Sequence, residues 1–358
     1  MSAGPETVKN VFRETKAYIA ALLAALVAVA WVLLLGSRPV SDDPQPVRVV
    51  IVRGASASRI ADLLDQKRLI RSSFVFKLSC RISGAGDKLK PGVYEFNRSM
   101  SLPQIIRRLQ DGRSLETWVT IPEGYNAYQI AVLLESRELA RSDAFLRLAI
   151  TQGYQFPSYT SVYGHNLEGY LFPDTYLVSR GTGPEAIIRK MLDAFEAKVV
   201  RARREELEEA VEDRFGLTDD RFPEGLHKLL TVASVVEREA RIERDRSLIA
   251  AVIWNRLAKG MKLEVDATVT YIPGQSGENK ARVFYKDLEN DSPYNTYRRY
   301  GLPPGPICNP GIASILAAMN PAPVDYLFYV ARKDGSHIFS RTHEEHLAAV
   351  RRVRSEGQ

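Results

Sequence analysis

The chain has 358 residues, of which 45% are hydrophobic and 26% charged, with a formal net charge of +6 at pH 7. This composition predicts a globular protein of two or three domains. The mild positive charge suits an anionic surface such as a membrane or cell wall. No dense Lys/Arg tract alternates with aromatic residues, so we expect no nucleic-acid partner. Cys80 and Cys308 are too few for a disulfide framework and lack metal-ligand spacing, so we expect two buried thiols.

The N-terminal region contains eighteen consecutive uncharged residues, 18–35. A membrane-spanning helix needs about 20 apolar residues, whereas a cleaved signal has a shorter apolar region and a small-residue exit. Lys9, Arg13 and Lys16 precede the segment and favour a cytoplasmic N-terminus. A cleaved signal or a buried core helix is the alternative. The prediction is a single-pass anchor in the cytoplasmic (inner) membrane with the remainder exported, divided into a tail (1–17), a transmembrane helix (18–36) and a polar linker (37–46).

The next block, residues 47–113, predicts a small β-α-α-β-α module. VRVVIV is typical of a strand, and ASASRIADLLDQKRLI has serines before apolar residues at helical spacing. SSFVFKLSCRI is compatible with a helix or a strand. Pro103 near the start and Gly112 at the end delimit a last helix. This order loosely resembles carbohydrate-binding LysM modules, and a spacer or docking module is the alternative.

Residues 114–358 form the larger predicted domain, which begins with a strand, a Pro-Glu-Gly turn and a helix. The segment NLEGYLFPDTYLV (166–178) sets aromatic rings beside carboxylates, a combination found in sugar-binding sites. A half-buried strand explains this segment equally simply and is preferred when it is taken alone. Residues 184–215 predict one long, charged, supporting helix because acidic and basic residues recur at i,i+4 spacing.

The segment TVASVVEREA (231–240) predicts the end of an amphipathic helix and raises the question of which glutamate performs chemistry. Glu239 continues the apolar stripe of Val232, Val235 and Val236, whereas Glu237 points away toward solvent or a neighbouring strand. Desolvation raises the pKa of a carboxyl group, which suits a general acid near neutral pH. The alternative is that Glu239 forms a buried ion pair with an arginine such as Arg241 or Arg256.

Two C-terminal segments add candidate binding residues. LEVDATVTY (263–271) has the composition of a strand, and YNTY (294–297) precedes the stiff loop GLPPGP (301–306). That loop could hold Tyr294, Asn295 and Tyr297 around a ligand, although proline-rich loops are often only connectors. The C-terminal histidines lack the spacing of a zinc helix, so we expect no metal and no cofactor; they are His337, His343 and His346.

Several motifs in one order resemble the endolytic murein transglycosylase family, the YceG-like proteins. The motifs are EGYLFPDTY (168–176), ASVVEREA (233–240), ERD (243–245), IWNRL (253–257), an M-x-L-x-x-D-x-T pattern (261–268), YNTY, GLPPGPI with NPG (309–311), and GSHIFSRTHEEH (335–346). They cover nearly everything from Thr117 onward. The resemblance implies an α+β fold with an N-terminal transmembrane helix, a small LysM-like α+β module and a larger mixed α+β catalytic domain.

The resemblance also implies an activity: internal cleavage of nascent peptidoglycan strands between N-acetylmuramic acid and N-acetylglucosamine, leaving 1,6-anhydro ends. Glu239 matches the catalytic glutamate of that family. One carboxyl group suffices because the muramyl C6 hydroxyl is an internal nucleophile, whereas an ordinary glycosidase needs two carboxylates. The expected substrate-binding residues are Glu237, Glu168, Tyr170, Phe172, Asp174, Asn255, Asp266, Thr268, Tyr294, Asn295, Thr296 and Tyr297.

Two other functions remain open at this stage. One is a muramidase-type hydrolase in which Asp174, Glu237 or Asp266 activates water beside Glu239. The other is a non-catalytic peptidoglycan-binding scaffold. The expected partners are glycan strands, the membrane through the N-terminal helix, and penicillin-binding or other wall-synthesis proteins.

Overall fold

The structure is a computed structural model that describes residues 31–112, 116–151, 159–179, 181–271 and 285–356, together with Leu23 and Val27. Most of the predicted transmembrane segment, and the predicted module boundary at residue 113, therefore lie outside the described residues. Within the described part of the chain, no helix combines the length and apolar character needed to cross a membrane. The chain divides into two compact units, residues 1–118 and 119–358.

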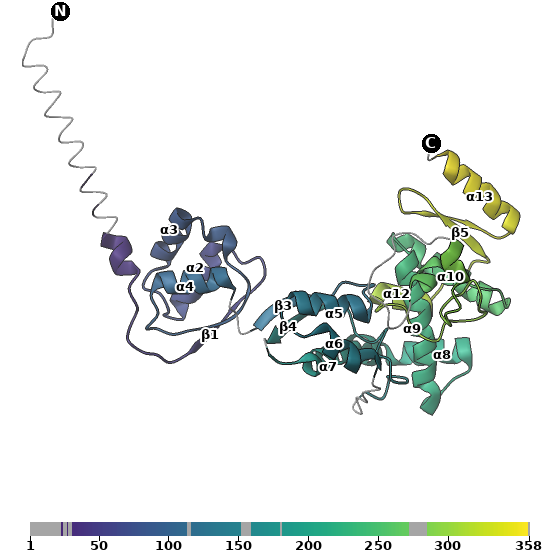
Figure 1. Ribbon diagram of the computed structural model, residues 1–358, viewed down its shortest axis with the longest axis horizontal. Coiled ribbons are helices and arrows are strands. Elements are labelled where there is room, and N and C mark those ends of the chain that lie inside the picture. Colours follow the sequence, from purple (N-terminus) through teal and green to yellow (C-terminus); the bar gives the residue numbers. More distant parts are fainter. Residues whose placement is uncertain are drawn as a thin grey trace, which may run out of the picture. The chain divides into compact units, whose positions relative to one another are not determined.

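Unit 1 has the predicted β-α-α-β-α order, which is confirmed (Figure 1). Strand β1 (Val47–Ile51) pairs antiparallel with β2 (Gly92–Phe96), so that Val47 faces Phe96. The segment SSFVFKLSCRI, which the sequence left as a helix or a strand, forms a helix. The side chain of Ser72 caps this helix by accepting from the Val75 amide. The helices of this unit are α2 (Ala57–Gln66), α3 (Ser73–Ser83) and α4 (Leu102–Asp111).

The core of unit 1 is apolar and lies between the β1–β2 strand pair and the helices. Tyr94 and Phe96 stack with ring centroids 5.6 Å apart and pack with buried residues of all three helices. Helix α4 begins with a capping box between Ser101 and Gln104 and ends at Gly112, whose φ of 69° favours glycine. Local sequence signals therefore define each element of this unit.

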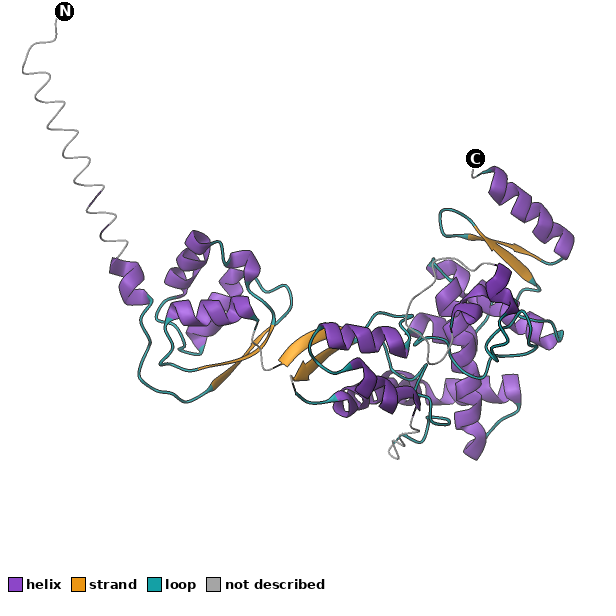
Figure 2. Ribbon diagram, in the orientation of Figure 1, coloured by secondary structure: helices purple, strands orange, loops and turns teal. Residues whose placement is uncertain are grey.

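Unit 2 is mainly helical and is built around α9 (Phe222–Glu239). Helix α9 packs against α8 (Arg204–Phe215), α10 (Arg246–Ala258) and α12 (Ile312–Met319). Figure 2 shows that strands make only a small part of this unit. The remaining helices are α5 (Ala127–Ser136), α6 (Ser142–Leu146), α7 (Pro184–Phe195), α11 (Asp266–Thr270) and α13 (His343–Ser355).

Two short strand pairs complete unit 2. Strand β3 (Glu116–Thr120), which spans the boundary between the units, neighbours β4 (Thr175–Ser179). Strands β5 (Phe328–Ala331) and β6 (His337–Ser340) form an antiparallel hairpin in which Tyr329 faces Phe339. The mixed α+β character that the sequence predicts is therefore confirmed.

Three predicted elements differ from the structure. The half-buried strand preferred for residues 166–178 forms only at its end, as β4 (Thr175–Ser179), because residues 166–174 are turns and irregular backbone that is mostly buried. Residues 184–215 do not form one α-helix, because a π-helical turn (Glu196–Val200) and a 3-10 turn (Arg201–Arg203) separate α7 from α8. The strand predicted within residues 263–271 is wrong, since Asp266–Thr270 forms the short helix α11. Its start is held by one distant and one local hydrogen bond: the Val265 amide donates to the Thr296 hydroxyl at 3.0 Å, and the Thr268 hydroxyl donates to the Val265 carbonyl at 2.7 Å. The β-branched residues of this segment favour a strand, but composition carries no information about these hydrogen bonds.

Candidate active site

Glu239 is the last residue of α9, a helix whose second half is largely buried. Every residue from Leu229 to Val236 is buried. The helix ends because Ala240 adopts an extended conformation with a ψ of 119°. The predicted apolar stripe of Val232, Val235 and Val236 therefore leads into a glutamate at the point where the helix opens onto a pocket.

That pocket has a volume of about 310 Å³ and is lined by residues from α9, α10, the segment before α11, and β5. Its polar side chains include Glu239, Arg256, Glu264, Asp266, Tyr297 and Tyr329. Burial, with a smaller contribution from the nearby Asp266 carboxyl, raises the pKa of Glu239 to about 7, although the Tyr329 hydrogen bond opposes the rise. A carboxyl group of this pKa can both donate and accept a proton near neutral pH.

Tyr329 of β5 restrains the Glu239 carboxyl. Its hydroxyl donates to Oε2 of Glu239 at 3.1 Å, and burial together with the Glu239 charge raises the pKa of Tyr329 well above its ordinary value. The phenol therefore stays protonated and remains a donor. The Ala267 amide is a second donor to this carboxyl group and also lowers its pKa, so a main-chain group and a phenol together restrain Glu239.

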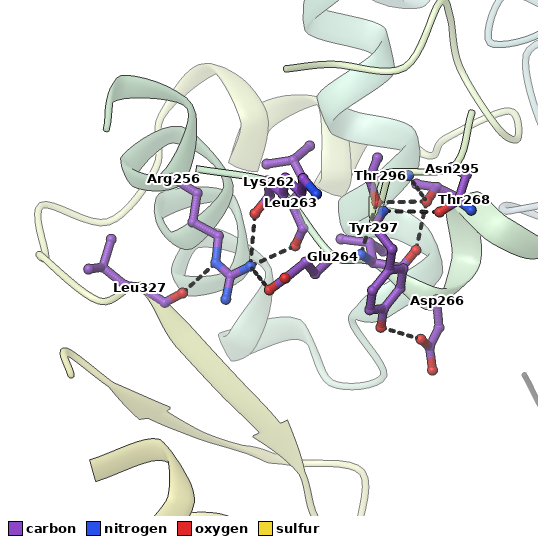
Figure 3. Close-up of polar contacts among 11 residues, drawn as sticks. Arg256, Lys262, Leu263, Glu264, Asp266, Thr268, Asn295, Thr296, Tyr297 and Leu327 are labelled. Carbon is purple, nitrogen blue, oxygen red and sulfur yellow. Dashed lines mark hydrogen bonds and ion pairs between the residues drawn. The ribbon is translucent and has the colours of Figure 1, made fainter. Parts of the chain in front are cut away.

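A second carboxyl group, that of Asp266, lines the same pocket. The Tyr297 hydroxyl donates to its Oδ1 at 2.6 Å (Figure 3). Burial and Asp266 raise the pKa of Tyr297, so this phenol is also a permanent donor near neutral pH. The pocket thus contains three carboxyl groups: Glu239 and Asp266 each accept from a tyrosine, and Glu264 pairs with Arg256.

Arg256 of α10 lines the pocket but does not pair with Glu239. Its guanidinium donates to the main-chain oxygens of Leu327, Lys262 and Leu263 at 2.7–3.0 Å and to the Glu264 carboxylate at 3.1 Å (Figure 3). Among the residues that the structure describes, Glu239 forms no ion pair. The buried ion-pair alternative is therefore not what the structure contains, and Arg256 instead joins the hairpin to the loop after α10.

Glu237 does not point to solvent, and that prediction is wrong. Its side chain is only 8% exposed; Oε2 lies 3.3 Å from Arg246 and accepts from the Gly311 amide at 3.1 Å. Gly124, in the Pro-Glu-Gly turn, also packs against Glu237. These loops, distant in sequence, cover the flank of α9 that a helical wheel assigns to solvent.

Comparison with known proteins identifies the family. A model of the YceG-like family matches residues 49–352. The chain belongs to this family. It is 36% identical over 322 residues to the endolytic murein transglycosylase of Bacillus subtilis, an alignment that covers 86% of this chain and 85% of that protein. It is 30% identical over 333 residues to the protein of the same name from Streptococcus pneumoniae strain R6, and spans only 58% of that longer relative.

A solved structure supports the same assignment. The crystal structure of a putative YceG-like protein from Listeria monocytogenes matches with a TM-score of 0.60 and 35% identity. The match covers 85% of this chain and 98% of that one. The likeness therefore includes both sequence and fold.

The YceG-like motif around Glu168 is buried rather than exposed. Glu168 has no exposed surface, and its carboxyl accepts from the Ala127 amide, the Tyr271 hydroxyl and the Asn309 amide at 2.9–3.1 Å. Burial raises its pKa to about 7, although these donors oppose the rise. The structure does not support direct glycan contact by Glu168, because its buried carboxyl group already accepts hydrogen bonds from three groups of the protein.

The other predicted residues of that motif also lie away from the Glu239 pocket. Tyr170 is fully buried, and its hydroxyl lies 3.0 Å from Nδ1 of His227. Phe172 is buried beneath Lys198, which also pairs with the Asp174 carboxylate. These side chains organise unit 2 around β4, and none of them lines the pocket.

The predicted polar residues near YNTY form a supporting network. Asn295, Thr296 and Thr268 are at most 1% exposed. The two threonine hydroxyls lie 2.8 Å apart, and Asn295 accepts from the Tyr297 amide at 3.0 Å (Figure 3). Tyr294 packs against Tyr271, and Asn255 donates to main-chain oxygens at Val324 and Tyr326. Among the predicted binding residues, only Asp266 and Tyr297 share the pocket with Glu239.

The sequence did not indicate Tyr329 or the Asp245–His337 pair that lies beside it. Asp245 accepts from both the amide and Nδ1 of His337, at 2.8 and 2.9 Å, and the His337 ring lies edge-on to Tyr329 with centroids 5.5 Å apart. The ERD and GSH motifs were the available signals, since they contribute Asp245 and His337. No cluster of metal-ligating residues occurs in the described part of the chain.

Proposed function

We propose that this protein is an endolytic peptidoglycan lytic transglycosylase in which Glu239 performs both proton transfers. The observation that carries the proposal is the desolvated Glu239 carboxyl, with a pKa of about 7, at the base of a pocket. Membership of the YceG-like family and the names of the relatives support the same activity.

The chemistry needs one carboxyl group. Protonated Glu239 donates its proton to the glycosidic oxygen between N-acetylmuramic acid and N-acetylglucosamine, and the bond from muramyl C1 to that oxygen breaks. The C6 hydroxyl of the same muramyl residue attacks C1, and the Glu239 carboxylate takes the hydroxyl proton. The products are a 1,6-anhydro end and a free 4-hydroxyl, without water. Tethering the nucleophile to the substrate provides the proximity that a bound water otherwise requires.

The position of Asp266 supports a second candidate function, that of a muramidase. Of the three carboxylates considered as water activators, only Asp266 lines the Glu239 pocket; Glu237 is bound to Arg246, and Asp174 to Lys198. Two carboxyl groups in one site are the usual requirement for hydrolysis. In the lytic reaction, Asp266 instead raises the pKa of Glu239 and keeps the acid protonated.

The setting of the enzyme is part of the proposal. Residues 18–36 anchor the chain in the cytoplasmic membrane, with the catalytic unit outside, where the peptidoglycan lies. The 47–113 module acts as a LysM-like glycan holder, and wall-synthesis proteins such as penicillin-binding proteins are expected partners. The uncharged stretch and the preceding basic residues support the anchor.

The decisive experiment replaces Glu239 by glutamine. Glu239→Gln preserves size but cannot transfer a proton, so the rate of anhydro-product formation should fall by at least about 10²–10⁴. Mass spectrometry of digested glycans measures this rate and distinguishes anhydro from reducing ends. Glu237→Gln is the matched control and should retain measurable turnover. If the wild type instead produces reducing ends, and Asp266→Asn no longer does, the enzyme is a muramidase.

Melting curves separate catalysis from folding in the same variant. The raised pKa of Glu239 contributes stability that is fully present below pH 4.5 and lost as the pH rises through about 7. Glu239→Gln should therefore melt near the wild-type temperature at pH 5 and above it at pH 8. Unfolding of Glu239→Gln at both pH values would show that the carboxyl is structural.

A further inference from the structure

A second pocket, of about 770 Å³, lies on a different flank of α10 from the Glu239 pocket. Helix α10 contributes Ile253 and Arg256 to the Glu239 pocket, but Trp254 and Leu257 to this one. At about 100° per residue, Arg256 and Trp254 point about 160° apart, whereas Ile253 and Leu257, one turn apart, lie on the same side of the helix. We call it the aromatic pocket, after the rings that line it: Tyr163, Phe215, Trp254 and Tyr300.

The rim of the aromatic pocket carries two exposed aromatic rings. Tyr300 is 71% exposed and Tyr163 is 46% exposed. Among the described residues of unit 2, only Val132 and Leu347 are other large hydrophobic residues with comparable exposure. Two exposed tyrosines beside one concave site indicate a binding site more strongly than scattered apolar residues do, because a rigid ring with a polar tip is suited to ligand contact.

The inner wall of the aromatic pocket is held in place by hydrogen bonds. His227 lies 3.1 Å through Nε2 from the Pro304 carbonyl, which can only accept, so Nε2 carries the proton. Nδ1 is then free to accept from the Tyr170 hydroxyl at 3.0 Å. Tyr163 packs against this fixed imidazole with ring centroids 5.5 Å apart. The GLPPGP loop contributes a stiff wall through Pro303 and Pro304.

The charges of the aromatic pocket are balanced. Its two acids are Asp213 and Glu224, and its two cations are Arg214 and Lys228. Lys228 pairs with Glu224 at 2.8 Å, and the Arg214 guanidinium lies over the Trp254 ring at 5.2 Å. Burial lowers the pKa of His227, so it adds no charge near neutral pH. A balanced, ring-lined pocket with scattered polar groups suits a neutral polyhydroxylated ligand better than an anion.

We propose that the aromatic pocket is a distal subsite for the sugar backbone of the glycan strand whose cleavage is assigned to Glu239. This inference rests on the proposed function. Tyr163 and Tyr300 stack on pyranose faces, and Asp213 receives sugar hydroxyls. Tyr297 of the Glu239 pocket and Tyr300 are three residues apart, so the two pockets are neighbours along one segment. A strand held at both places is cut internally rather than at its end.

The test compares long and short substrates with the purified full-length protein. Tyr300→Ala and Tyr163→Ala, alone and combined, are assayed on long peptide-free glycan strands and on the shortest oligosaccharide that the wild type cleaves. Loss of two stacking contacts should raise KM for long strands on the order of tenfold, with kcat unchanged. On the short substrate, neither parameter should change. Val132→Ala, an exposed apolar position on α5, is the matched control and should behave as wild type on both.

Binding measurements make the result independent of turnover. Glu239→Gln protein should bind uncut peptide-free strands, and adding Tyr300→Ala should weaken that binding on the order of tenfold. Equal loss on long and short substrates, or no loss at all, overturns the subsite. Displacement of the glycan by stem peptide alone also overturns it, because the occupant is then a peptide. Tyrosine-dependent glycan binding without any cleavage by the wild type rejects the proposed function but retains the subsite.

Discussion

Glu239 and Glu168 have the same raised pKa of about 7 for the same first reason, burial, yet their surroundings differ. Glu239 accepts from the Tyr329 hydroxyl and the Ala267 amide, and it faces a pocket. Glu168 accepts from a main-chain amide and two side chains and has no exposed surface. A perturbed pKa therefore marks a catalytic candidate only together with access to substrate.

Tyr329→Phe tests how Glu239 is tuned. The Tyr329 hydrogen bond lowers the pKa of Glu239, so its removal should raise that pKa, while Asp266 and Arg238 act as before. The first step needs the protonated acid, so activity falls as the pH rises through the Glu239 pKa. The alkaline limb of the pH–rate profile should therefore move to higher pH in Tyr329→Phe. Tyr326→Phe, a neighbour that does not line the pocket, should leave the limb in place, and an unmoved limb in Tyr329→Phe would contradict the assignment.

Glu168→Gln tests the structural role of the buried carboxyl. The amide offers one acceptor where the carboxyl offers two, and it directs an N–H group at existing donors. We expect the free energy of unfolding to fall by about 2–4 kcal/mol, measured by chemical denaturation. Asp174→Asn, which disrupts only the surface pair with Lys198, should change it by no more than about 1 kcal/mol. Unchanged stability with lost glycan binding would restore Glu168 as a contact residue.

At the scale of elements, the β5–β6 hairpin positions Tyr329 over the end of α9. Asp245, at the start of α10, holds the hairpin through His337, whose side chain is only 2% exposed. Arg256 holds the other strand at Leu327. Contacts at the two ends of α10, from Asp245 and from Arg256, therefore fix the hairpin against the pocket.

Asp245→Ala should loosen this arrangement and reduce kcat through Tyr329. If Asp245 acts by placing the phenol, the Asp245→Ala and Tyr329→Phe changes are coupled, and the double variant loses little more than Tyr329→Phe alone. Steady-state kinetics of the four proteins measures the coupling. Asp325→Ala, which removes only an exposed pair with Arg341, is the control. Additive losses in kcat would show that the Asp245–His337 pair affects the protein by another route.

At the scale of the whole molecule, the proposed anchor determines where the catalytic unit works. Cys308 is fully buried, so it should react with a membrane-impermeant thiol reagent from the outer side only after unfolding. In a Cys80→Ser background Cys308 is the only cysteine of the sequence, which makes the label specific. A tag at residue 2 should remain protected. Protection of unfolded Cys308, or labelling of the tag from outside, would contradict an exported catalytic unit.

The sequence by itself determined the elements whose signals are local. The module order of unit 1 followed from serine caps, Pro103 and Gly112, and the apolar stripe of α9 followed from its spacing. The place of Glu239 at the end of that stripe was predicted in the same way, because it depends only on the period of one helix. The π and 3-10 turns between α7 and α8 were missed, since charge spacing does not reveal a break in helical geometry.

Tertiary structure alone decided which side chains surround Glu239. Tyr329 lies 90 residues from Glu239 in sequence, and Gly311 lies 74 residues from Glu237. No periodic pattern records such contacts, because they depend on how loops and hairpins fold back onto α9. For the same reason Glu237 is covered where a helical wheel expects solvent. Glu168 belongs to the interior for that reason too: its partners Tyr271 and Asn309 come from segments more than 100 residues away, and only packing brings them together.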